Sequence, residues 1–255
     1  MIDLSIPQLP IPQMNGNYSF SMEMFMHLGL SDTYGNLNLK NMDYAQKHHY
    51  INQLLREVYF DHTLEKHKIR DEIYTVDNLF YKVKNNTETL IYWLRKSADD
   101  YISLAYLTYY LYIKKQSVGQ FAIDSIGSLL YGKNDSEVRS VLKEAFGSHL
   151  HSLNILNEVS NTFKHAFAHH EIMHLIGKDE PTVIELSTNK NDFTKPLKYN
   201  SYSLRQIVQN YTVFYLDAES QIKKWIDEWM QRSIEENRKN ESNKDEQWNT
   251  LNQIS

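Results

Sequence analysis

The chain has 255 residues, of which 23% are charged and 41% are hydrophobic, so it is expected to fold around a core rather than stay disordered. Its formal net charge of −5 argues against binding of nucleic acid through bulk electrostatics, and the absence of cysteine excludes disulfides, iron–sulfur clusters and thiol catalysis. Eight glycines and five prolines are few for this length, which favours long helices over turn-rich sandwiches or barrels.

The sequence predicts no association with a membrane. Its longest apolar stretch, residues 102–113, is shorter than the roughly 20 residues that a spanning helix needs. The first basic residue is Lys40, so the positively charged start of a secretory signal is missing. We therefore expect a cytoplasmic protein.

The N-terminal part of the chain is predicted to be irregular and to pack on a helical body. Residues 1–40 contain most of the prolines, and 18–25 could form a short strand. Asp43 followed by Gln46 has the pattern of a capping box, and the apolar residues after it recur at helical spacing. This pattern predicts a helix over 44–68.

The next part of the chain predicts a helix over 75–95 and then a new one. Ser97 followed by Asp100 has the pattern of a helix start. Residues 102–113 are apolar nearly all round, which indicates a helix buried at the centre of a bundle.

A long helix is predicted from Ser136 to about Ile176. Gly177 and Pro181 are typical of the end of such a helix. Thr182–Leu186 is rich in β-branched residues and is expected to be a strand of a small hairpin.

The last predicted helix begins at a second capping box, formed by Ser203 and Gln206, and has apolar residues at every third or fourth position. A turn is expected before it at Asn189–Asp192. Residues 232–255 are polar and are expected to fray.

The predicted fold class is therefore mainly α, a helical bundle with a small β-hairpin and an irregular N-terminal arm. The expected organisation is an arm over 1–40, a helical domain over 41–235 and a polar tail over 236–255.

Histidines concentrate in the helix predicted from residue 136 to 176. Six of the eleven lie there, at positions His149, His151, His165, His169, His170 and His174. Asn161 precedes His165 by four residues, which is about one helical turn, so the two side chains could reach one ligand.

This stretch resembles the signature of the HEPN superfamily of helical ribonucleases and nucleotide-binding proteins, in which an arginine and an asparagine precede a histidine. The resemblance carries over Asn161 and His165 only. Ser160 stands where the family has its arginine, and Lys164 is the nearest substitute cation. The resemblance implies a bacterial protein of defence or stress response that binds or cleaves RNA or a nucleotide without metal or cofactor, with a homodimer as one arrangement.

The same resemblance assigns roles for a cleavage reaction. His165 would handle the proton of the 2′-hydroxyl or of the leaving group, Lys164 would neutralise the phosphate, and Asn161 would position it. Binding without cleavage stays open, because the arginine is replaced. Arg56 with His62 has a looser form of the spacing, on an early helix where the two side chains point about 120° apart.

A second hypothesis is a zinc hydrolase. The segment His170-Glu171-Ile172-Met173-His174 matches the HExxH pattern, in which two histidines bind zinc and the glutamate activates a water. Glu180 would be the third ligand. The helical character of the preceding residues argues against this reading, since such proteases lay substrate along a strand.

A third hypothesis is a helical interaction protein without chemistry. In that case the face that carries Asn161 and His165 would be buried against a partner. The isolated glycines form no phosphate-binding loop, so ATP binding of that type is excluded.

Overall fold

The computed structural model describes residues 6–10, 37–68, 76–165, 179–186, 199–252 and the single residues 194 and 196. It is mainly helical with a two-stranded antiparallel hairpin, which confirms the predicted fold class. The predicted strand at 18–25 and the predicted turn at Asn189–Asp192 lie outside the described residues.

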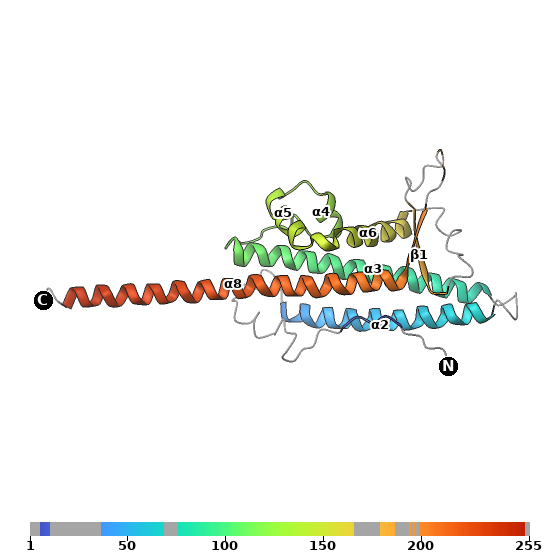
Figure 1. Ribbon diagram of the computed structural model, residues 1–255, viewed down its shortest axis with the longest axis horizontal. Coiled ribbons are helices and arrows are strands. Elements are labelled where there is room, and N and C mark those ends of the chain that lie inside the picture. The colour runs from blue at the N-terminus through green and yellow to red at the C-terminus, as the bar shows by residue number, and fades with distance from the viewer. Residues whose placement is uncertain are drawn as a thin grey trace.

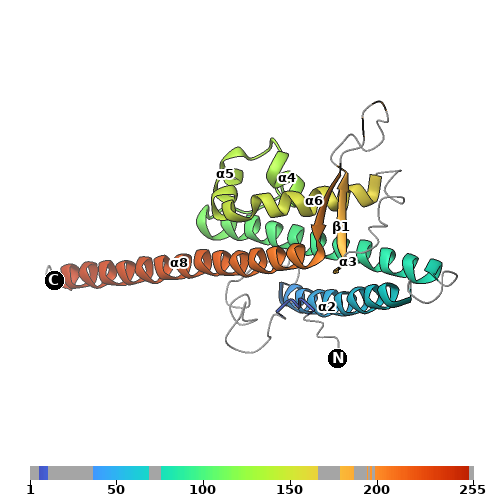
Figure 2. The same cartoon turned by 45° about the vertical axis from the view of Figure 1, so that its right-hand side comes forward.

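The described elements follow one another along the chain as α2 (Leu37–Lys68), α3 (Val76–Thr108), a π-helical turn (Tyr109–Ile113), α4 (Ile126–Tyr131), α5 (Ser136–Ala145), a 3₁₀ turn (Gly147–His149), α6 (Leu150–His165), β1 (Thr182–Leu186), β2 (Tyr199–Ser203) and α8 (Leu204–Asn252). The long helices α2, α3 and α8 lie side by side, and α4, α5 and α6 cover the opposite side of α3 (Figures 1 and 2). Helix α3 contacts each of the others and is the centre of the bundle. None of the described helices contains an apolar stretch of the length that a bilayer span requires.

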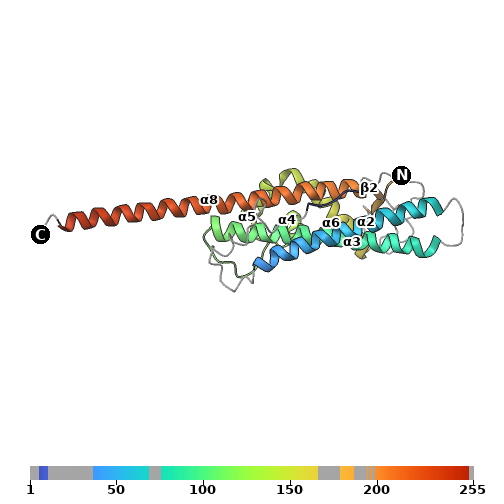
Figure 3. The same ribbon diagram turned by 90° about the horizontal axis from the view of Figure 1, so that it is seen from below.

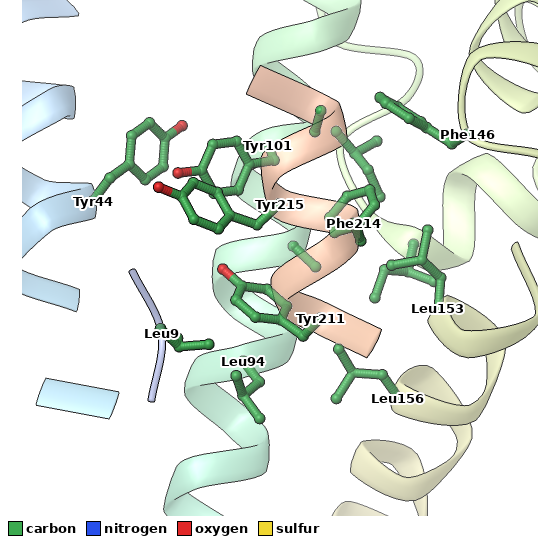
Figure 4. Packing of buried hydrophobic residues seen from close by; sticks show 14 of the residues in the cluster. Leu9, Tyr44, Leu94, Tyr101, Phe146, Leu153, Leu156, Tyr211, Phe214 and Tyr215 are labelled. Atoms are coloured by element: carbon green, nitrogen blue, oxygen red, sulfur yellow. The ribbon is translucent and has the colours of Figure 1, made fainter. Parts of the chain in front are cut away.

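The core forms where α2, α6 and α8 bury their apolar stripes against α3. Figure 4 shows that Phe214 of α8 points toward α6, whereas the rings of Tyr211 and Tyr215 point toward α2. Leu94 and Tyr101 of α3 complete this layer, and both are fully buried. Of the apolar segment predicted to be central, residues 102–108 belong to α3 and are buried except Ser103, which confirms the prediction there, whereas 109–113 form the π-helical turn and only Tyr112 is buried.

Helix α3 runs without a break through the place where the sequence predicts a new start. Ser97 is fully buried, and its Oγ shares a hydrogen bond with the hydroxyl of Tyr211 at 2.6 Å. Asp100 pairs with Lys47 at 2.5 Å and with Lys96 at 3.0 Å. The capping pattern was misleading because both polar side chains bind neighbours in tertiary structure instead of backbone at a helix end.

The helix predicted from 136 to 176 is divided into α5 and α6, so that prediction is wrong. Phe146 leaves the helical conformation, with φ −107° and ψ 17°, and its ring packs against Phe214 at 5.5 Å between centroids. The 3₁₀ turn that follows brings His149 into the interior, where Nε2 lies 2.8 Å from Asp217 Oδ2. Residues 166–178 lie outside the described part.

The start of α2 and the end of α8 also differ from the sequence prediction. Helix α2 begins at Leu37, so Asp43 lies inside it and pairs with Lys47 at 2.6 Å rather than capping the start. Helix α8 continues to Asn252 and projects beyond the bundle (Figures 1 and 3). The segment after Arg232 that was expected to fray is therefore helical up to Asn252, although its five asparagines are weak helix formers.

The hairpin confirms the strand predicted at Thr182–Leu186. This strand, β1, pairs with β2 in antiparallel register, with Thr182 opposite Ser203 and Leu186 opposite Tyr199. Ser203 then starts α8, because its Oγ accepts the backbone N–H of Gln206 at 3.4 Å, as the capping pattern predicts.

The described part of the N-terminal arm, residues 6–10, packs on the helical body. The side-chain amide of Asn52 accepts from the N–H of Leu9 at 2.7 Å and donates to its carbonyl at 2.9 Å. Nδ1 of buried His48 lies 2.9 Å from the carbonyl oxygen of Pro10 and Nε2 lies 3.1 Å from the Tyr211 hydroxyl. Burial lowers the pKa of His48 to about 4, so the ring is neutral at physiological pH and donates to Pro10 through Nδ1.

A carboxyl group lies among the tyrosines between α3 and α8. Tyr101 donates to Glu219 Oε1 at 3.3 Å, and the hydroxyl of Tyr215 also donates to this side chain. Burial raises the pKa of Glu219 to about 7, although both tyrosine hydrogen bonds lower it. The folded protein therefore holds a proton on Glu219 more tightly than the unfolded chain does.

This proton predicts a pH dependence of stability. Between pH 5 and pH 8 the folded protein must release the proton on Glu219, which the unfolded chain has largely lost by pH 5. The contribution of Glu219 to the free energy of unfolding therefore falls by about 2 to 3 kcal/mol over this range. Glu219→Gln removes this loss. Urea unfolding of the wild type and of the Glu219→Gln variant at the two pH values measures this loss. The contribution of His48 to the pH dependence has the opposite sign and is the same in both proteins, so it cancels in the comparison. An identical change with pH in both proteins would contradict the assignment.

Two glycines near α4 offer a matched pair for a test of packing. A Cβ at Gly132 would collide with the carbonyl oxygen of Ser128, which already accepts from the Gly132 N–H at 3.1 Å and from Arg139 Nε at 3.2 Å. A Cβ at Gly127 meets nothing within 4 Å. We expect Gly132→Ala to lower the free energy of unfolding by about 1–3 kcal/mol and Gly127→Ala to raise it by about 0.5–1 kcal/mol. Urea unfolding measures both, and equal effects would contradict the packing described.

Candidate anion-binding site

The predicted motif on α6 is joined by an arginine from α3. Arg95 Nη1 donates to Asn161 Oδ1 at 3.2 Å and lies 3.4 Å from Ser160 Oγ. Ser160 is buried and Asn161 is half-buried, and the arginine side chain is 17% exposed. The guanidinium is therefore held at the seam between the two helices with one edge near solvent.

One carboxylate partly balances this arginine. Asp99 Oδ2 lies 3.9 Å from Arg95 Nε, at the limit of an ion pair, and Asp99 Oδ1 accepts the backbone N–H of Ile126 at 2.7 Å. Burial raises the pKa of Asp99, while the Ile126 hydrogen bond and the Arg95 charge lower it. Arg95 Nε is buried without a hydrogen-bond partner and Nη1 is engaged by Asn161, so Nη2 is the donor that Arg95 can offer to a ligand.

A second cation, Lys164, lies on the next turn of α6. Its Nζ is 5.7 Å from the centre of the Tyr92 ring, and no ion pair joins it to a carboxylate of the described residues. Burial and the charge of Arg95 lower the pKa of Lys164, and the charge of Asp99 raises it. Two cations that repel each other around one carboxylate leave a local excess of positive charge, which favours an anion.

The structure brings together two of the three residues of the predicted RNA site. Asn161 and Lys164 lie on the same part of α6, and Arg95 lies beside them. His165 is the last residue of α6, one turn beyond Asn161, and its side chain is outside what the structure describes. We name the group of Arg95, Asn161 and Lys164 the Arg95 cluster.

The described part of the chain does not bring together the residues of the predicted zinc site. His170, Glu171 and His174 lie outside it. Glu180, the proposed third ligand, accepts from Arg205 Nε at 3.2 Å. Among the residues that the structure describes, no group of histidines and carboxylates is placed to hold a metal ion.

Arg95 is the functional candidate that sequence reasoning missed. It lies 66 positions before Asn161, inside a segment whose pattern predicts only a helix. No local signal identifies it, because the contact depends on how α3 and α6 pack. The absence of an arginine at position 160 was a reason to search for one elsewhere in the fold.

Comparisons with models of protein families, with curated proteins and with solved structures find no match for this chain. The geometry of the site is therefore the basis for the function proposed below.

The influence of Arg95 on Lys164 can be measured directly. We expect Arg95→Gln to raise the pKa of Lys164 toward its ordinary value without reaching it, because the repulsion disappears while the burial remains. Carbon NMR of labelled lysine side chains measures this pKa. Lys96→Gln is the control, since Lys96 is on the same helix but pairs with Asp100. An unchanged Lys164 pKa in the Arg95 variant would contradict the proposed proximity of the two charges.

Proposed function

We propose that this protein binds a phosphate group of RNA or of a nucleotide at the Arg95 cluster. The observation that carries the proposal is the arginine of α3 that bonds to Asn161 beside Lys164, a lysine with no carboxylate partner in the described part of the chain. A phosphate oxygen anion would relieve the repulsion between the two cations. Arginine supplies directed donors for such an oxygen and lysine supplies a point charge.

The net charge of the chain supports a short ligand. At −5 the protein as a whole repels a long polyanion, so attraction is confined to the neighbourhood of the cluster. A single nucleotide or a few nucleotides of RNA satisfy this condition better than an extended duplex.

The position of Arg95 also supports the HEPN resemblance. Ser160 occupies the sequence position of the family's arginine, and Arg95 Nη1 lies within 3.4 Å of the Ser160 hydroxyl. A guanidinium from another helix thus takes the place of the missing side chain.

Cleavage adds one requirement to binding. The imidazole of His165 would take the proton of the ribose 2′-hydroxyl, whose oxygen attacks the adjacent phosphorus as the bond to the 5′-oxygen breaks and that oxygen is protonated by water. Arg95 and Lys164 would stabilise the charge that develops on the phosphate oxygens. Asn161 holds the guanidinium in place for this task.

Lys164→Ala tests the proposed binding. We expect it to weaken binding of a dye-labelled five-nucleotide RNA about tenfold and to reduce the slope of log affinity against log salt by about 0.7. Fluorescence anisotropy at several salt concentrations measures both quantities. Lys224→Ala, at an exposed lysine of α8, is the control and should leave both unchanged.

Further outcomes separate the hypotheses. His165→Ala should keep RNA binding and abolish any cleavage seen with the wild type, which distinguishes binder from ribonuclease. Equal affinities of the Lys164→Ala and Lys224→Ala proteins would reject the proposed function. If Lys164→Ala instead weakens a complex with another protein and RNA does not bind, the interaction hypothesis replaces it.

A further inference from the structure

Three aromatic side chains form a continuous strip across the surface of α2 and α3. Tyr92 and Trp93 of α3 make an edge contact at 5.4 Å between ring centroids, with planes at 78°. Trp93 and Tyr50 of α2 make another at 5.8 Å and 86°. We name these three residues the aromatic strip.

Two of the three side chains of the strip are exposed to solvent. Tyr92 is 43% exposed and Tyr50 is 40% exposed, whereas Trp93 is partly buried and packs against the core. Rings that meet edge to face cover less of each other than stacked rings do. Exposed ring surface of this kind is what a nucleic-acid base uses for stacking.

One end of the strip meets the Arg95 cluster. Lys164 Nζ lies 5.7 Å from the centre of the Tyr92 ring, so phosphate-binding and stacking groups are neighbours. Arg95 follows Tyr92 by three residues on α3, which places both on one side of the helix. A nucleotide has this same combination of an anionic group next to a flat ring.

A carboxylate lies along α2 from the strip. Glu57 follows Tyr50 by seven residues on the same face of α2, and its carboxylate accepts from Gln53 at 3.0 Å and from Asn86 at 3.3 Å. Since this carboxylate repels phosphate, a bound backbone is disfavoured in that direction along the helix.

We propose that the ligand of the Arg95 cluster is a short single-stranded RNA whose bases stack along the aromatic strip, with one of its phosphates held by Arg95 and Lys164. This inference rests on the proposed function and narrows its ligand class. A duplex is excluded as a ligand of the strip, because its bases are paired and stacked on one another. A mononucleotide uses only the end of the strip next to Lys164.

Tyr50→Leu tests the strip without touching the cluster, because Tyr50 is at the end away from Lys164. We expect the affinity for the labelled five-nucleotide RNA to fall about tenfold, as for loss of a stacked base. Binding of unlabelled uridine monophosphate, measured by calorimetry, should be unchanged. Phe60→Leu is the matched control, since Phe60 is an aromatic residue of the same helix that is 57% exposed and lies outside the strip.

The outcomes distinguish failure of the strip from failure of the site. If Lys164→Ala weakens RNA binding while Tyr50→Leu and Tyr92→Leu act no differently from Phe60→Leu, the strip is overturned and the phosphate site stands. Equal affinity for a duplex and for a single strand of the same length would also overturn the strip. If neither RNA nor uridine monophosphate binds the wild type, the proposed function fails together with this inference.

Discussion

The uninterrupted course of α3 is the constraint on which the rest of the structure depends. At Ser97 the helix could have ended, but the hydroxyl of Tyr211 on α8 engages that side chain at 2.6 Å inside the core. The turn of α3 just before Ser97 carries Trp93, which contacts Tyr50 of α2, and Arg95, which bonds to Asn161 of α6. The arginine meets Asn161 only because three helices are packed against one rod (Figure 2).

The polar groups of the bundle fall into two classes that differ in how their charge is balanced. In the core, Glu219 is held by tyrosine hydroxyls in a place where burial favours its neutral form, and Lys47 is paired with Asp100 at 2.5 Å. At the seam between α3 and α6, Arg95 and Lys164 share one distant carboxylate, Asp99, among the described residues. The charged groups of the core are balanced within the protein and need no ligand. The two cations at the seam would be stabilised by a bound anion, and for this reason the seam supports a binding function.

Composition and periodicity were enough to predict an α-bundle, the strand at Thr182–Leu186 and the cap at Ser203, because these depend on local patterns. The same reasoning failed at Ser97 and at Phe146, where a tertiary contact decides between continuing and ending a helix. For the site, the motif located Asn161 and Lys164 but had no means to locate Arg95, since a contact across 66 positions leaves no periodic trace. The side chain of His165 and the HExxH segment lie outside the described residues, so the roles predicted for them stay predictions.

A double-mutant cycle determines whether Arg95 and Lys164 bind the same phosphate. The affinities of the wild type, Arg95→Gln, Lys164→Ala and the double variant for one short RNA give the coupling between the two side chains. If they do, we expect a coupling of at least about 0.5 kcal/mol, so that the second substitution costs less affinity once the first has been made. Factors of lost affinity that simply multiply in the double variant, or single variants that bind the RNA as tightly as the wild type, would contradict binding of one phosphate by both side chains.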